Sequence, residues 1–187
     1  MSRFLQYGGI AASVILIAFG IGSIVTGANG RDRVHNDLAR EQIVGTPDST
    51  IPNQLVNTGS KAEAFAKVMR KHTLEATGGK TYAQMPRFMG KNGQPTSNEK
   101  AAAVDPKSGK PVDNPARNLW VTETALTTAL HSSYFAESVA TFAIVMGVAM
   151  LLSGIGFLIL TLRVLRGPAE ATEATKAKAP RQQAVPA

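Results

Sequence analysis

The 187-residue sequence contains no cysteine, which excludes disulfides, thiolate catalysis, iron–sulfur clusters and cysteine-ligated zinc. This absence fits either side of a membrane, so it indicates no redox compartment. Catalytic signatures are also lacking, since the sequence has no GxSxG, HExxH or P-loop motif. An SxxK match at residues 97–100 stands without the partner motifs of the enzymes that use it. These patterns predict no catalytic activity.

Charge is missing from two long stretches, residues 8–28 and 138–162. About 20 apolar residues are enough to cross a bilayer as a helix. Because a helix satisfies its own backbone hydrogen bonds and two segments cannot close a barrel, we predict two transmembrane helices. The first stretch is longer than the apolar region of a signal peptide, so we expect an uncleaved anchor.

Positive charge gathers beside these two stretches. Residues 1–28 and 163–187 together hold six Lys or Arg and two acidic residues, whereas the middle of the chain holds fourteen and eleven. Such an excess marks the cytoplasmic side of a membrane. It predicts a multi-pass protein of the plasma membrane with both termini cytoplasmic and residues 29–137 extracytoplasmic. The net charge of +7 then reflects topology, and we expect no nucleic-acid partner.

Small residues recur at helical spacing in both apolar stretches. Such residues let membrane helices approach closely, so they predict that the two spans pack as an antiparallel hairpin. Two alternatives remain: glycine is common in membrane helices in general, and one stripe could face another protein. The predicted packing residues are Gly9, Ser13, Gly20, Ser23 and Gly27 in the first span and Ala140, Ala143, Gly147 and Gly154 in the second.

The segment between the spans carries start and stop signals of helices. Ser60 followed by Glu63 has the capping-box pattern, and the helix it would begin ends at Gly78. Asn114 before Pro115 has the pattern of an N-cap and first residue of a helix, which no breaker interrupts until after the second span. We therefore expect both spans to continue as helices outside the membrane.

Two segments lack such periodicity. Residues 88–113 are rich in Gly, Pro, Lys, Ser and Asn, which predicts an exposed mobile loop. Residues 163–187 are rich in Ala, Pro and charge, which predicts a disordered cytoplasmic tail. The expected fold is an all-α membrane protein: a cytoplasmic N-terminus at 1–7, a hairpin of two transmembrane helices at 8–28 and 138–162, and a small extracytoplasmic helical domain at 29–137.

Two further expectations concern the extracytoplasmic domain. Glu137 lies at the start of the second span and Arg31 and Arg33 at the end of the first, so we predict an interfacial ion pair that fixes helix register, the alternative being an exposed charge. Apolar residues at helical spacing predict an outer core, consisting of Phe65, Val68, Met69, Leu119, Leu126 and Leu130.

Three stretches resemble a family of small two-span membrane proteins of actinobacteria. They are RDRVHNDLAREQIVGTPD, HTLEATGGKTYAQMPR and ALTTALHSSYFAESVATFAIVMGVAMLLSGIGF, and the part EATGGKTYAQM is the most specific. Residues 88–113 depart from the family's pattern and look inserted. Members of this family are often labelled aromatic ring-opening dioxygenases. The resemblance implies the two-span fold, and it implies no function that matching residues would transfer to this chain.

Extradiol ring cleavage requires a non-haem iron held by two histidines and a carboxylate. The sequence has three histidines, His35, His72 and His131, and His72 with Glu75 forms an i, i+3 pair that could face one metal. His72 also lies in the middle of an apolar stripe, which is typical of a core histidine. His35 and His131 lie among polar residues, as histidines on solvated faces do. We therefore expect no metal and no other cofactor.

No sequence motif identifies the function, so we compare three hypotheses. The first hypothesis is a non-catalytic membrane accessory or scaffold subunit that binds a larger envelope complex through its outer helices or its small-residue stripes. Its expected partners are membrane lipids and other integral membrane proteins, with a homo-oligomer left open. The alternatives are a free-standing envelope protein, and a metal-binding protein or enzyme that uses His72 and Glu75.

Overall fold

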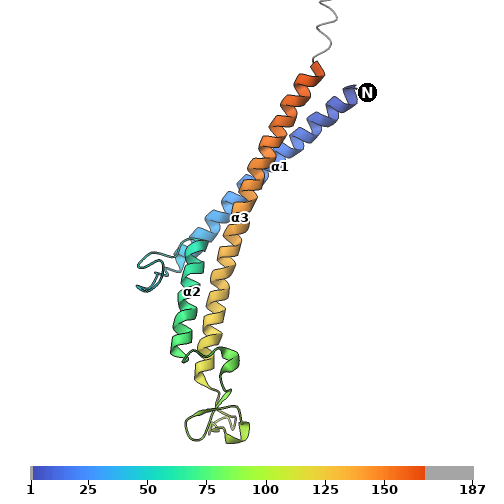
Figure 1. The fold of residues 1–187 in the computed structure, drawn as a ribbon. Coiled ribbons are helices and arrows are strands. Elements are labelled where there is room, and N and C mark those ends of the chain that lie inside the picture. Colours follow the sequence, from blue (N-terminus) through green and yellow to red (C-terminus); the bar gives the residue numbers. More distant parts are fainter. Residues whose placement is uncertain (1, 167–187) are drawn as a thin grey trace, which may run out of the picture. The chain divides into compact units, whose positions relative to one another are not determined.

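Three helices account for most of the described chain (Figure 1). The computed structural model describes residues 2–166 and the side chains of residues 4–163. Most of the predicted disordered tail therefore lies outside the described residues. The elements are α1 (Ser2–Arg40), α2 (Gly59–Ala76), the short 3-10 helix η1 (Tyr82–Gln84), β1 (Phe88–Met89), β2 (Pro95–Thr96), the short 3-10 helix η2 (Glu99–Ala101) and α3 (Pro115–Arg166).

The chain divides into two compact units. The two-helix unit comprises the described parts of Met1–Ala28 and Thr141–Ala187, and the three-helix unit comprises Asn29–Ala140. Helices α1 and α3 run from one unit into the other, so both extend beyond their apolar stretches as the sequence predicts.

The two-helix unit turns its large apolar side chains outward. Phe19, Phe142 and Leu152 are 67%, 64% and 64% exposed. Both α1 and α3 are long and apolar enough to cross a membrane, and only 11% of the apolar window of each is buried. The core helix of a water-soluble domain would be mostly buried, so this exposure favours lipid as the surroundings of the two helices.

Glycines set the contact between α1 and α3 within the two-helix unit. A Cβ atom added at Gly147 would lie 2.7 Å from the carbonyl oxygen of Gly20, and one added at Gly20 would lie 2.8 Å from that of Gly147. Farther along, a Cβ at Gly154 would lie 3.0 Å from the Ser13 oxygen, and one at Gly9 2.6 Å from Oγ1 of Thr161. As residue numbers increase along α1, the numbers of the contacting residues on α3 decrease. The two helices therefore run antiparallel and side by side (Figure 1).

The other small residues of the predicted stripe have different surroundings. Gly27 is buried, whereas Ser23 and Ala143 are half-buried. Ala140 is buried but belongs to the three-helix unit, where its Cβ would lie 3.6 Å from a Cβ added at Gly30.

We expect Gly20→Leu and Gly147→Leu to separate α1 from α3, because the added atoms would overlap backbone and cost about 1–3 kcal/mol or more. The chain has no cysteine, so a Gly9→Cys, Thr161→Cys pair gives a specific disulfide as the readout. Either leucine should lower its yield several-fold. Gly22→Leu is the matched control, since nothing lies within 4 Å of a Cβ added there. Equal yields in all three variants would contradict the packing.

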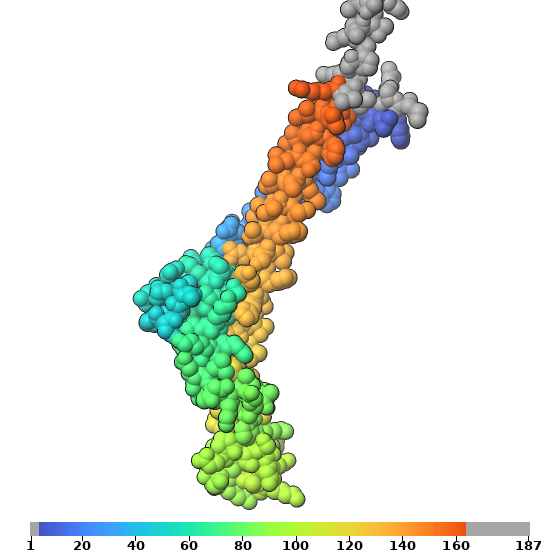
Figure 2. All heavy atoms as spheres, viewed as in Figure 1, coloured from blue at the N-terminus to red at the C-terminus, as the bar shows by residue number. Residues whose placement is uncertain are grey.

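The three-helix unit is held by a small apolar core. α2 lies beside α3 in the ribbon, and side chains fill the space between them (Figures 1 and 2). Two alanines of α2, Ala62 and Ala66, are 0% and 2% exposed, so this helix contacts the core through its smallest side chains. The core cluster consists of Leu38, Val56, Ala62, Ala66 and Leu130, and Phe65 and Met69 are partly buried against it.

The predicted outer core is wrong at two positions on α3. Leu119 and Leu126 are 45% and 49% exposed, although Val68 and Leu130 are buried as expected. The face of α3 that is buried in this unit follows a different helical stripe, which includes two polar residues and therefore gives a weak hydrophobic signal. Its members are Trp120, Glu123, Thr127 and Leu130.

The ends of α2 and the start of α3 test the capping signals. The N-cap of α2 is Thr58, whose Oγ1 accepts from the Lys61 N–H, so the prediction of Ser60 as N-cap is wrong. Gly78 has φ of +62°, which confirms the predicted left-handed C-terminal turn. Asn114 is confirmed as the N-cap of α3, because its Oδ1 accepts from the N–H of Ala116 at 3.1 Å.

Residues 88–113 form more regular structure than a loop. Phe88 pairs with Thr96 and Met89 with Pro95 in an antiparallel ladder of two short strands. Three isolated bridges extend this pairing, between Phe88 and Asp113, Gly90 and Ala102, and Val104 and Pro111. Phe88 and Ala102 are buried in the middle of this segment. A polar composition does not predict backbone pairing of this kind, so the sequence missed it; the mobility of the segment stays a prediction.

Candidate interaction site

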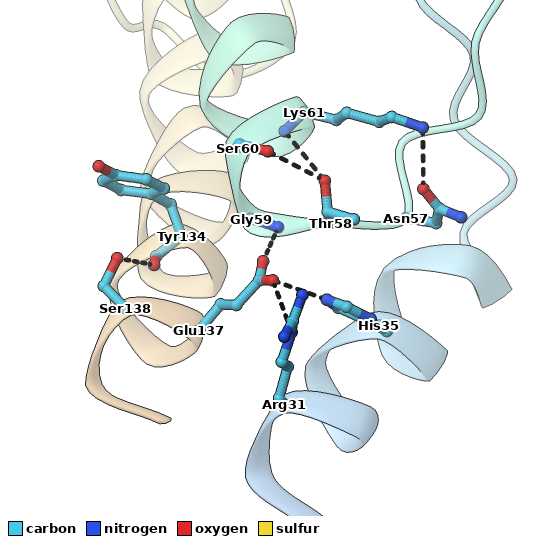
Figure 3. A network of polar contacts seen from close by, with 10 residues as sticks. All are labelled: Arg31, His35, Asn57, Thr58, Gly59, Ser60, Lys61, Tyr134, Glu137 and Ser138. Atoms are coloured by element: carbon cyan, nitrogen blue, oxygen red, sulfur yellow. Dashed lines mark hydrogen bonds and ion pairs between the residues drawn. The ribbon is translucent and has the colours of Figure 1, made fainter. Parts of the chain in front are cut away.

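The Glu137 carboxylate lies where three helices of the three-helix unit meet (Figure 3). Its Oε1 accepts from Nε2 of His35 at 2.7 Å and is 3.4 Å from Nε of Arg31, both on α1. Its Oε2 accepts from the backbone N–H of Gly59, the first residue of α2. One side chain of α3 thereby joins α1 and α2. We call these four residues the Glu137 junction.

Local structure explains why these groups converge. Arg31 and His35 are four residues apart on α1, so they lie on one helical face. The first N–H groups of a helix have no partner inside the helix and lie at the positive end of its dipole, so the N–H of Gly59 suits a carboxylate. Residue 59 also has to be small, because a Cβ there would lie 2.7 Å from Oε2 of Glu137 and 2.8 Å from Cα of Tyr134.

The surroundings of Glu137 keep its carboxyl group ionised. Its side chain is only 15% exposed, and this burial acts to raise the pKa. The hydrogen bonds from His35 and Gly59 and the charges of His35 and Arg31 outweigh burial, so the pKa lies below its ordinary value of 4.5. An ionised carboxylate only accepts hydrogen bonds, so Nε2 of His35 carries the proton in this contact.

The sequence anticipated part of this junction. The structure brings Arg31 to Glu137 but not Arg33, which belongs to none of the ion pairs among residues 4–163. His35 and Gly59 were missed. The four-residue spacing of Arg31 and His35 could have revealed His35, whereas no sequence signal pointed to Gly59 because its role depends on the approach of α3.

The residues considered for a metal site are not brought together. Nε2 of His72 bonds to Oδ2 of Asp48 at 2.9 Å and the side chain is 43% exposed, so the interpretation as a core histidine is wrong. Oε1 of Glu75 lies 3.9 Å from Nζ of Lys71. His35 is engaged by Glu137 and His131 is exposed. No group of three His, Cys, Asp or Glu residues within the described part of the chain could hold a metal ion.

His72 takes part in a surface contact between α2 and the segment before it. Asp48 accepts from Lys71 at 2.9 Å and from His72 at 2.9 Å, and Oγ1 of Thr46 donates to its other oxygen at 2.8 Å. These hydrogen bonds, with that from Lys71 contributing most, hold the pKa of Asp48 well below its ordinary value. These contacts join the segment before α2 to α2 itself on an exposed surface.

An apolar groove of about 670 Å³ opens beside the core of the three-helix unit. All three helices contribute to its walls: Leu38 from α1, Phe65 and Met69 from α2, and Leu126 and Leu130 from α3. Acidic Asp37 and Glu41 lie at its edge, and none of its lining residues is basic. Leu126, which we predicted in the outer core, instead lines this groove.

Compared with known proteins, the chain matches no protein-family model, no curated protein and no solved structure.

We expect Glu137→Arg to destabilise the three-helix unit by about 1–3 kcal/mol, because it removes an acceptor and places a cation beside Arg31. Adding Arg31→Glu should restore part of the loss, whereas adding Arg33→Glu should not. Trp120, the only tryptophan, is 3% exposed, so its fluorescence reports unfolding in detergent. Equal rescue by both arginine reversals, or by neither, would argue against the Arg31 pair.

The low pKa of Glu137 predicts a pH dependence with a definite sign. Folding favours the ionised carboxylate, so its contribution is fully present above about pH 4.5 and is lost as the pH falls through the lower folded-state pKa. The isosteric variant Glu137→Gln should lower the unfolding midpoint at pH 7, and the gap from the parent chain should narrow below pH 4.5. The pKa values of Asp48 and Asp105 are also lowered, but both chains contain these residues. Their titration therefore affects the parent and the variant equally and leaves the gap unchanged. A gap that stays constant down to pH 3 would contradict the assignment.

Proposed function

We propose that this chain is a non-catalytic, two-span membrane protein that serves as an accessory or scaffold subunit of a larger complex. The observation that supports this proposal most is the apolar groove, whose walls come from three helices and whose edge is acidic. An exposed apolar surface bordered by polar residues is a common feature of protein–protein contacts.

The arrangement in the membrane follows from the charge distribution. The two apolar helices cross the plasma membrane as a hairpin, with the basic ends of the chain in the cytoplasm. Residues 29–137 then lie outside the cytoplasm, and the groove faces the envelope. Ser133, which lines the groove, precedes the expected second span by about one helical turn of α3.

The Glu137 junction gives the groove fixed walls. Phe65 and Met69 belong to α2, whose first N–H is bonded to Glu137. Leu38 belongs to the part of α1 that follows Arg31 and His35. Because the same carboxylate binds both helices, the walls keep their spacing without a large core. A preformed surface loses less entropy on binding than a flexible one, which suits a scaffold.

The direct test is purification of the tagged, full-length chain from its native membrane in mild detergent, followed by native mass spectrometry. We expect a complex of fixed stoichiometry with at least one other integral membrane protein. The variant for comparison is Glu137→Arg, in which α1 and α2 lose their common contact with residue 137 of α3. It should retain much less partner. Elution of the parent chain alone would refute the subunit proposal and favour a free-standing envelope protein.

A further inference from the structure

Resting on the proposed function, we propose that the apolar groove binds one amphipathic helix of a partner membrane protein, with Lys or Arg of that helix beside Asp37 and Glu41. The proposal concerns the occupant of the groove, which the general subunit function leaves open. Its basis is the shape of the groove, the chemistry of its walls and the sign of the charge at its edge.

The shape of the groove suits a helix. On the α3 side, its lining residues are Leu126, Ala129, Leu130 and Ser133, which follow the three- and four-residue spacing of one helical face. This face is about 10 Å long, or two turns. A small residue in its middle, Ala129, lets another helix approach closely, as ridge-into-groove packing requires. The partner is expected to present apolar residues at i, i+3 or i+4, and i+7.

The walls have too little cover to be a finished core. Leu126 is 49% exposed, and Phe65 and Met69 are only partly buried. A helix laid on Phe65, Met69 and Leu126 would remove their apolar surface from water, which is the main favourable term in association.

Charge at the edge selects the kind of helix. Asp37 and Glu41 are four residues apart at the end of α1, and no basic residue lines the groove. Asp37 has an exposed pair with Arg40 at 3.0 Å, a type of contact that is worth little, and no ion pair among the described residues involves Glu41. Two acidic side chains therefore favour a cationic partner.

The same charges disfavour lipid as the occupant. Phospholipid headgroups carry phosphate, and anionic lipids add net negative charge, so Asp37 and Glu41 would repel them. A second copy of this chain is disfavoured for another reason: the alanines of its amphipathic helix α2, Ala62 and Ala66, are already buried in its own core.

The test places a photoreactive phenylalanine derivative at Leu126 in the full-length chain and irradiates native membranes. Leu119 is the matched control, because it lies on the same helix and is 45% exposed but does not line the groove. We expect a cross-link from position 126, at least about tenfold above that from 119, to one partner protein. The cross-linked peptide should come from an amphipathic helix that carries Lys or Arg.

Charge reversal tests the recognition itself. Asp37→Lys with Glu41→Lys should lower the cross-link yield from position 126 about tenfold, as expected when an attractive edge becomes repulsive. Lysine is tolerated at the end of a helix, so α1 should persist. Glu99→Lys, a reversal of another exposed acidic residue away from the groove, should change nothing.

Several outcomes would overturn this inference. They are a cross-link to lipid, a cross-link to a second copy of the chain, a peptide without basic residues, equal yields at positions 126 and 119, and indifference to the double reversal. If native purification still recovers a complex of fixed stoichiometry, the subunit function stands and only the occupant is wrong. If no partner co-purifies, the proposed function itself has failed.

Discussion

A single carboxylate, Glu137, determines how the three-helix unit is assembled. It is largely buried, which costs free energy unless the charge is compensated. Compensation comes from Arg31 and His35 on α1 and from the first N–H of α2. Because the contributions come from both α1 and α2, the charge on α3 is fully satisfied only when all three helices are in place. The small core of alanines and leucines adds apolar contact, but the junction sets which helices meet and where.

A different constraint governs the two-helix unit, whose large apolar side chains point outward and bury little apolar surface between the helices. Contact there depends on close approach, which Gly20, Gly147 and Gly154 allow because any Cβ would overlap the neighbouring backbone or side chain. Ser13 is fully buried in this contact, and its Oγ donates to the Gly9 oxygen at 2.7 Å within its own helix. The hydroxyl is thus satisfied locally, so it can lie at the interface without a polar partner on α3.

The sequence predicted features that are encoded locally and missed those that depend on distant contacts. The N-cap at Asn114 and the left-handed Gly78 follow from short-range chemistry, and both are present. The prediction of the outer core was wrong at Leu119 and Leu126. Hydrophobicity alone favours burial of these leucines over burial of a stripe that contains Glu123 and Thr127 beside Trp120. Trp120 is buried, and its Nε1 donates to the Lys80 oxygen at 3.0 Å, a contact with a residue forty positions away that periodicity cannot reveal.

The sequence by itself determined the two long apolar helices and their small-residue stripes, because hydrophobic length and residue size are local properties. It also singled out Glu137 as a charge in need of a partner. Only the tertiary structure decided that His35 and the Gly59 N–H join Arg31 there, and that Leu126 lines a groove instead of a core. The reason is physical: hydrogen bonds and grooves depend on the relative positions of helices, and those positions result from the whole set of contacts.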